Sequence, residues 1–189
     1  MKKVLCFIYD DFADFEIVLA CMPLYHSEDY RIEFIAYEDS PIKSWGGLTI
    51  IPDKKVSEVS ETNDIEGIIF PGGNGRIVKP ELTKLVNQLN EEKKLLAAIC
   101  AGPEFLAKMG LLNGVKYTTS EPPEIYEENN EIDPFPRDTF IEKRVVQDGN
   151  IITAQGYAFI DFALEIWDWL DLYEKDSEKE EDKKRFTPN

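Results

Sequence analysis

The sequence predicts an α/β protein with a mostly parallel central sheet that helices cover on both faces. Short apolar runs alternate with segments of helical spacing along the 189 residues, which is the pattern of repeated strand–helix units. The runs at residues 4–9, 65–70 and 95–99 are almost entirely apolar, as expected for strands buried on both faces. This length allows one domain with a substantial core.

The first half of the chain contains these predicted elements, in order: strand 4–9, helix 15–24, strand 31–37, short strand 45–52, brief helix 56–59 and strand 65–70. The acidic residues at 10–14 fit a turn that caps the first helix, because carboxylates accept hydrogen bonds from the free N–H groups there. That helix is apolar on nearly every side, which indicates burial around most of its circumference.

The second half continues the alternation with surface helix 80–93, strand 95–99, a helix from residue 103, strand 115–119, a hairpin of strands 145–146 and 151–154, and amphipathic helix 159–173. Between 121 and 136 the chain is rich in acid and proline, which indicates a long loop that serves as a lid or a partner surface. We expect residues 1–173 to form one domain, and the charged residues 174–189 to form a mobile tail.

The chain carries 21 basic and 37 acidic residues, a formal charge of −16. This charge repels nucleic-acid phosphates and anionic lipid, so neither nucleic acid nor a membrane is an expected partner. Three cysteines without a C-x-x-C spacing provide neither a disulfide framework nor a zinc site, and no metal or cofactor is expected. Asp10 and Asp11 end the first apolar run too early for a signal peptide, so the expected location is the reducing cytoplasm.

Cys100 lies where the strand 95–99 ends and a helix begins. Proline is favoured in the first turn of a helix, so Pro103 places the helix start directly after the cysteine. The free N–H groups and the helix dipole favour a reactive thiolate there, and the same donors could stabilise an oxyanion. The alternative is a small packing residue at a strand end. Packing is also the role expected of Cys6, inside the first apolar run, and of Cys21, on a face of the first helix.

Glu16 is the one charged residue in the apolar first helix. Its carboxyl group is expected to face a pocket, where burial raises its pKa; alternatively, it is a first-turn carboxylate that the helix dipole stabilises. The glycine-rich loop 71–75 either turns its amides toward a ligand or forms a flexible connection. Ligands bind beyond the carboxyl ends of parallel strands, and four predicted loops leave such ends: 10–16, 71–75, 100–103 and 119–121.

Four motifs carry a specific resemblance: Phe12-Ala13-Asp14-Phe15-Glu16, Phe70-Pro71-Gly72-Gly73-Asn74, Ala97-Ala98-Ile99-Cys100-Ala101-Gly102-Pro103 and Tyr117-Thr118-Thr119. In order and spacing they resemble the ThiJ/PfpI superfamily, the group that includes human Parkinson disease protein 7 and has the class I glutamine amidotransferase-like fold. The resemblance covers roughly residues 2–172. It implies a flavodoxin-like three-layer sandwich, usually a homodimer, with Cys100 on a nucleophile elbow.

The resemblance also implies roles for individual residues. Glu16 corresponds to a protonated acid that hydrogen-bonds the Cys100 thiolate, and the amides of Gly73 and Ala101 correspond to an oxyanion hole. Four further residues line the implied site: Gly72, Asn74, Gly102 and Pro103.

The chain departs from the family pattern directly after the Thr-Thr motif. Relatives with protease or glyoxalase chemistry usually carry a histidine there, whereas this chain has Ser120 and then Glu121. Its one histidine, His26, is expected to be a surface or structural residue near the end of the first helix. Because histidine usually activates a cysteine nucleophile and protonates a leaving amine, amide hydrolysis lacks its usual proton carrier unless Glu121 replaces it.

These observations leave three functional hypotheses. In the first, the chain is a glyoxalase-like enzyme whose Cys100 adds to a small electrophile such as a reactive carbonyl compound, with Glu16 as proton carrier. In the second, it is an oxidation-sensing or chaperone-like stress protein that uses the same thiol. In the third, which the missing histidine disfavours, it is a PfpI-type peptidase or amidase. The expected ligand is therefore a small electrophile or a peptide, and a non-catalytic scaffold is a further alternative.

Overall fold

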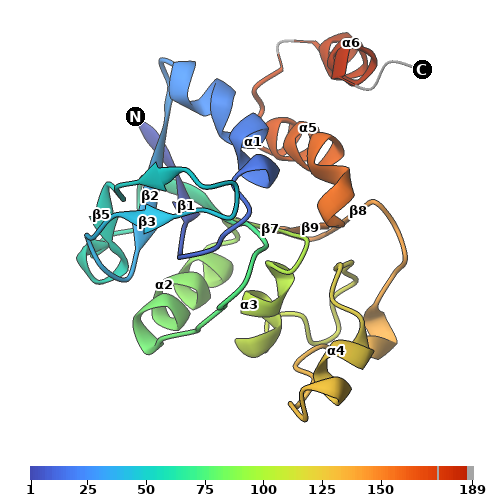
Figure 1. Ribbon diagram of the computed structural model, residues 1–189. Coiled ribbons are helices and arrows are strands. Elements are labelled where there is room, and N and C mark those ends of the chain that lie inside the picture. Colours follow the sequence, from blue (N-terminus) through green and yellow to red (C-terminus); the bar gives the residue numbers. More distant parts are fainter. Residues whose placement is uncertain (174, 187–189) are drawn as a thin grey trace.

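The computed structural model describes residues 1–173 and 175–186 and has the predicted α/β architecture (Figure 1). Within these residues the central sheet has the strand order β5-β2-β1-β6-β7-β9-β8. Its strands are β1 (Lys2–Phe7), β2 (Tyr30–Ala36), β5 (Lys54–Lys55), β6 (Ile65–Phe70), β7 (Leu95–Ile99), β8 (Val145–Asp148) and β9 (Ile151–Ala154). Neighbouring strands pair in parallel except β8 and β9, which form an antiparallel hairpin. The predictions of a mostly parallel sheet and of this hairpin are confirmed.

Helices cover both faces of the sheet and complete a three-layer sandwich (Figure 1). Helices α1 (Phe15–His26) and α5 (Phe159–Trp169) pack together on one face, and α2 (Pro80–Glu91) and α3 (Pro103–Lys108) lie on the other. Every residue of β7 is fully buried between the two layers, as its unbroken apolar run predicted. Smaller elements complete this part of the chain: the hairpin β3 (Ile42–Lys43) and β4 (Thr49–Ile50), and the 3₁₀ turns η1 (Val56–Glu58) and η3 (Gly156–Ala158).

The strand predicted at 115–119 is wrong. Tyr117 forms only an isolated bridge to Phe140, in which the Ile141 N–H donates to the Tyr117 carbonyl oxygen (2.8 Å). The sheet position beside β7 is already taken by β9, so the β-like spacing of 115–119 finds no partner strand. The loop that follows contains the short helix α4 (Pro123–Glu128) and the 3₁₀ turn η2 (Arg137–Thr139), and it projects from the sandwich (Figure 1).

The charged segment at the end of the chain contains a helix that the sequence analysis did not predict. Helix α6 (Asp176–Phe186) packs beside α5, where Lys179 pairs with Glu165 (3.1 Å) and Asp168 (2.7 Å). Glutamate and lysine favour helices even without an apolar stripe, which is why a search for apolar periodicity misses it. The predicted mobility of 174–189 stays a prediction, and residues 174 and 187–189 lie outside the described residues.

The carboxyl ends of four neighbouring strands, β1, β6, β7 and β9, point the same way and bring the loops that follow them together. This edge is where ligands bind in open parallel sheets. In the described ranges no helix combines the length and the apolar character that crossing a bilayer requires.

Candidate active site

Cys100 occupies a strained bend between β7 and α3. Its φ of 62° is in the left-handed region, which non-glycine residues seldom adopt, and strain of this kind gathers at functional sites. The bend is held on both sides: the Cys100 N–H donates to the Ala154 carbonyl (2.8 Å), and the Cys100 carbonyl accepts from the Thr119 hydroxyl (2.8 Å). A side chain at Gly102 would lie 2.4 Å from the Phe70 carbonyl oxygen, so the turn requires glycine there.

Glu16 lies against the Cys100 sulfur. It is in the first turn of α1, is only 1% exposed, and accepts a hydrogen bond from the Gly72 N–H at Oε2 (2.7 Å). Its carboxyl group is also hydrogen-bonded to the Cys100 side chain. Two glycines make room for this contact, because a Cβ at Gly156 would lie 2.9 Å from Sγ and one at Gly72 would lie 2.8 Å from Oε2.

The Glu16 carboxyl and the Cys100 thiol both have raised pKa values. Burial raises the pKa of Glu16 to about 7, against the opposing hydrogen bonds from Cys100 and Gly72. Burial, together with the charge and hydrogen bond of Glu16, raises the pKa of the Cys100 thiol to about 12. The Ala101 amide lowers the pKa of the thiol, as the sequence analysis expected of helix-start amides, but the other two effects outweigh it. The predicted resting thiolate is therefore corrected: at neutral pH the Cys100 sulfur keeps its proton, and the Glu16 carboxyl group is close to half ionised.

Ser120 is hydrogen-bonded to the Cys100 side chain and belongs to a network centred on Gln155. The Gln155 amide nitrogen donates to the Thr118 hydroxyl (2.8 Å) and the Thr119 carbonyl (2.8 Å), so Oε1 faces Ser120 and accepts its hydroxyl hydrogen (3.0 Å). The Gly156 N–H donates to Ser120 Oγ (2.9 Å). With its one hydrogen committed to Gln155, Ser120 does not carry protons as histidine does, and its effect on Cys100 is to lower the pKa of the thiol.

A cavity of about 510 Å³ opens beside the cysteine. Its wall includes Cys100 and both predicted oxyanion residues, Gly73 and Ala101, together with these residues: Trp45, Asn74, Gly75, Arg76, Ile77, Glu104, Lys108, Glu121, Ile125, Asn129 and Glu131. Of the four residues predicted to line the site, only Asn74 does so. Gly72, Gly102 and Pro103 lie behind the wall, where Gly72 holds Glu16 and the other two form the turn into α3.

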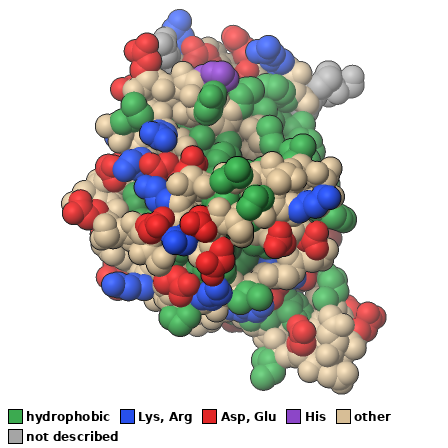
Figure 2. All heavy atoms as spheres, turned by 60° about the vertical axis from the view of Figure 1, so that its left-hand side comes forward, with side chains coloured by type: hydrophobic (Ala, Val, Ile, Leu, Met, Phe, Trp, Pro, Cys, Tyr) green, Lys and Arg blue, Asp and Glu red, His purple; other side chains and the backbone are tan. Residues whose placement is uncertain are grey.

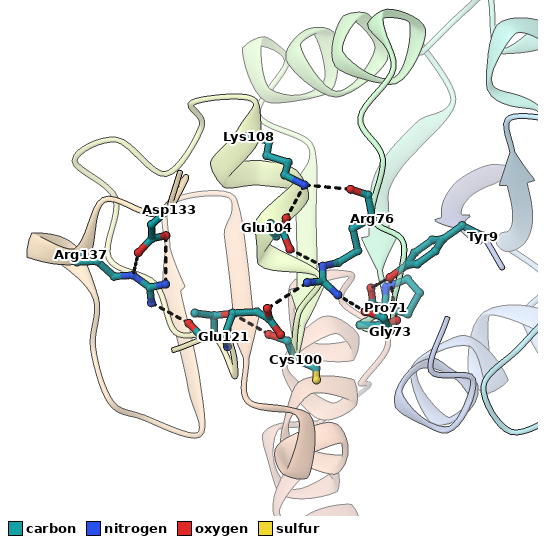
Figure 3. Close-up of polar contacts among 12 residues, drawn as sticks. Tyr9, Pro71, Gly73, Arg76, Cys100, Glu104, Lys108, Glu121, Asp133 and Arg137 are labelled. Carbon is teal, nitrogen blue, oxygen red and sulfur yellow. Dashed lines mark hydrogen bonds and ion pairs between the residues drawn. The ribbon is translucent and has the colours of Figure 1, made fainter. Parts of the chain in front are cut away.

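One side of the cavity is an ionic cluster that the sequence analysis did not identify. The Arg76 guanidinium is paired with Glu104 (2.5 Å) and Glu121 (3.0 Å), and it also donates to the Gly73 carbonyl. Lys108 pairs with Glu104 as well. Burial raises the pKa of Glu121, which the Arg76 charge opposes. In Figure 3 the Cys100 sulfur points away from this cluster, so Glu121 is an ion-pair partner of Arg76, and no contact joins it to the sulfur.

Sequence reasoning also missed Gln155 and Gly156. Both follow β9, which the sequence indicates only as half of a hairpin. Its parallel pairing with β7 is what brings its carboxyl end to the same edge as Cys100. No local motif indicates Arg76 or Gln155, because their roles depend on which way a side chain turns.

A strained cysteine at the carboxyl edge of a parallel sheet, with a helix directly after it, defines an α/β protein with a nucleophile elbow. Residues 2–168 match the DJ-1/PfpI family, and the chain belongs to this family.

Two relatives and one solved structure illustrate the relationship. The chain is 30% identical over 173 residues to "Uncharacterized protease YdeA" of Bacillus subtilis, covering 91% of this chain and 85% of that protein. It is 28% identical over 127 residues to "Deglycase TK1284" of Thermococcus kodakarensis, covering 62% and 72%. The crystal structure of the DJ-1 superfamily protein Atu0886 from Agrobacterium tumefaciens superposes with a TM-score of 0.80 at 27% identity, covering 95% of each chain.

Proposed function

We propose that the protein is a cysteine-dependent enzyme that acts on small reactive carbonyl compounds. The observation that carries the proposal is the buried Glu16 carboxyl group, which has a pKa of about 7 and is hydrogen-bonded to the Cys100 side chain at the wall of a cavity. A base is most effective when its pKa is near the working pH. Glu16 is therefore suited to take the thiol proton that Cys100 must lose to attack a carbonyl carbon.

The reaction with methylglyoxal follows from this arrangement. Cys100 Sγ bonds to the aldehyde carbon, the carbonyl electron pair moves to oxygen, and Glu16 takes the thiol proton. The amides of Gly73 and Ala101 hold the oxyanion until Glu16 returns the proton and a hemithioacetal forms. Glu16 then moves the proton on the former aldehyde carbon to the neighbouring ketone carbon, while the hemithioacetal hydroxyl proton passes to the ketone oxygen, which gives the thioester of a 2-hydroxy acid. Water hydrolyses this thioester to the free 2-hydroxy acid and the Cys100 thiol.

The direct test incubates the purified protein with methylglyoxal and measures its consumption together with the 2-hydroxy acid formed. We expect turnover by the unmodified protein. Equal rates for the unmodified protein, Cys100→Ala and a protein-free control would overturn the proposal. The name of the deglycase relative supports carbonyl chemistry, while the protease name of YdeA supports the amidase alternative.

The amidase alternative is less well supported by the site. A leaving amine needs a proton donor, and the hydroxyl hydrogen of Ser120 is committed to Gln155. Glu121 is held by Arg76. Glu16 remains as the one acid hydrogen-bonded to the sulfur among the described residues, which is sufficient for thiol addition and leaves no second carrier for the amine.

A second candidate function is oxidation sensing, because Cys100 is partly exposed while Cys6 and Cys21 are buried. Mild peroxide is expected to add two oxygens to Cys100 as a sulfinic acid, with each peroxide reduced to water, and to leave the other two thiols unchanged. Peptide mass spectrometry checks this, with Cys100→Ser as the control. Oxidation spread evenly over all three cysteines would contradict it. The raised pKa of Cys100 slows such oxidation, so we rank this function second.

We also propose that the protein is located in the reducing cytoplasm, where its three free thiols are stable. We further propose that it forms a homodimer through the outer face of α1. Four large apolar side chains are exposed there at helical spacing: Phe15, Val18, Met22 and Tyr25. Figure 2 shows hydrophobic side chains gathered around the one histidine, which lies in the last turn of α1. The net charge of −16 continues to argue against nucleic-acid and membrane partners.

Light scattering after size-exclusion chromatography is expected to give about twice the 21.7 kDa chain mass. Val18→Asp places a charge in the proposed interface and is expected to shift the protein to monomer. Ile132→Asp is the matched control, because Ile132 is 94% exposed on the projecting loop. A monomeric unmodified protein, or equal masses for the two variants, would contradict this interface.

A further inference from the structure

Tyr9 lies behind the glycine-rich loop 71–75 and is not among the residues that line the cavity. Its ring is packed against Phe7 (5.9 Å between ring centroids) and Phe105 (5.3 Å). Its hydroxyl group lies between two successive carbonyl oxygens, 3.0 Å from that of Pro71 and 2.9 Å from that of Gly72. In Figure 3 Tyr9 approaches this loop from one side and Arg76 approaches it from the other.

The position of these carbonyl groups fixes the direction of the amides that follow them. In a trans peptide the C=O and N–H groups point in opposite directions. The Pro71 carbonyl faces Tyr9, and the next N–H, that of Gly72, accordingly points to the other side and donates to Glu16 (2.7 Å). The Gly72 carbonyl also faces Tyr9 and accepts the Ala13 N–H (2.9 Å), so the Gly73 N–H turns to the Glu16 side as well.

Two successive N–H groups that point the same way form a concave donor pair suited to an anion. Gly73 has a φ of 126°, which the loop needs in order to hold this shape. The Gly72 N–H is occupied by Glu16. Within the described residues the Gly73 N–H donates to no protein group, and Gly73 lines the cavity beside Cys100.

We propose that Tyr9 is a positioning residue: its hydroxyl, held between the Pro71 and Gly72 carbonyls, orients the Gly72 amide toward Glu16 and the Gly73 amide toward the developing oxyanion. The effect on turnover rests on the proposed function, whereas the effect on Glu16 does not. Without the hydroxyl, both carbonyls lose a shared donor. The Gly72 amide is then left to its bond with Glu16, and the Gly72–Gly73 peptide to the Ala13 N–H, so the direction of both amides is held less firmly.

The test compares Tyr9→Phe with Tyr30→Phe. Phenylalanine keeps the ring contacts in both variants. Tyr30 is the matched control, because its hydroxyl also binds a backbone carbonyl, that of Leu170 (2.9 Å), away from the cavity. For Tyr9→Phe we expect kcat with methylglyoxal to fall about tenfold or more while KM changes less than about threefold, as for a weakened oxyanion donor. Tyr30→Phe is expected to keep both constants.

A second readout needs no turnover. The Gly72 N–H lowers the pKa of Glu16, so a loosened amide is expected to move the titration midpoint of the Glu16 carboxyl carbon, followed by NMR, to higher pH. A general loss of stability does not move this midpoint. Unchanged kcat and an unchanged midpoint in folded Tyr9→Phe would overturn the proposal. If the unmodified protein shows no turnover, the proposed function fails and the midpoint alone decides the role of Tyr9.

The unmodified protein offers a measurement that does not depend on the variant folding. A hydroxyl hydrogen held between two carbonyl oxygens in a buried site exchanges slowly with water and gives a resolved NMR signal near the Tyr9 ring. Fast exchange of this hydrogen, at a rate like that of the exposed Tyr25 hydroxyl, would overturn the proposal as well.

Discussion

Replacing Cys100 with alanine is expected to lower methylglyoxal turnover by about 10³-fold or more, because the covalent step has no substitute nucleophile. Cys6 and Cys21 are buried away from the cavity and cannot replace it. The fold is expected to survive, because alanine keeps the Cβ of residue 100 and removes only the sulfur atom. Turnover and circular dichroism of the same preparation check the two statements together.

Cys21→Ala is the matched control for this substitution. It also removes a thiol, but from the buried side of α1, and it is expected to retain turnover with a small loss of stability. Retained activity in folded Cys100→Ala would show that the cysteine is not the nucleophile. Loss of activity in both variants would point to a shared effect on folding.

Glu16→Gln is expected to reduce kcat by about 10²-fold or more, because glutamine has nearly the same shape and cannot take the thiol proton. Alkylation of Cys100 by iodoacetamide is expected to change in the opposite direction. Burial and the Glu16 charge raise the pKa of the thiol, so removing the charge lowers that pKa, and alkylation at pH 8 becomes several-fold faster, on the order of tenfold.

The pH dependence has a definite sign. The proposed active form carries one proton on the Glu16–Cys100 pair, and it is reached when the first of the two protons leaves. For the unmodified protein kcat/KM is therefore expected to rise with pH and to be half-maximal near pH 7, the Glu16 pKa, and to lose about tenfold per unit below it. In Glu16→Gln this limb is expected to disappear.

Glu33→Gln is the matched control, because Glu33 is also a buried carboxylate but pairs with Lys54 (2.8 Å) on the far edge of the sheet. It is expected to keep both turnover and the alkylation rate. Slower alkylation in Glu16→Gln, or a pH profile that keeps its limb near 7, would contradict the assignment of Glu16 as proton carrier.

Much of the architecture could be predicted because strand and helix patterns are local. The apolar run 95–99 and the proline at 103 define the Cys100 turn from the sequence alone, and the isolated charge of Glu16 in an apolar helix indicates a buried group. The strand at 115–119 could not be excluded in the same way. Its spacing is that of a strand, and only the placement of β9 beside β7 removes its partner.

The protonation states of Cys100 and Glu16 are harder to predict from the sequence than the fold is. A helix start predicts a lowered thiol pKa, but the outcome depends on how deeply the sulfur is buried and on which group faces it. Ser120 illustrates the same limit, because the partner of its hydroxyl hydrogen depends on the orientation of Gln155, 35 residues away. Tyr9 shows no motif at all, since its contacts are to backbone atoms of another loop.

The backbone conformation at Cys100 affects which substitutions evolution would favour at this position. Glycine adopts a φ of 62° at a lower energetic cost than cysteine does, so the residue that would best stabilise this turn is one without a sulfur atom. Stability of the fold and reactivity of the thiol therefore favour different residues at position 100. Selection for stability alone would favour replacing Cys100 with glycine, which would remove the nucleophile and leave the fold unchanged.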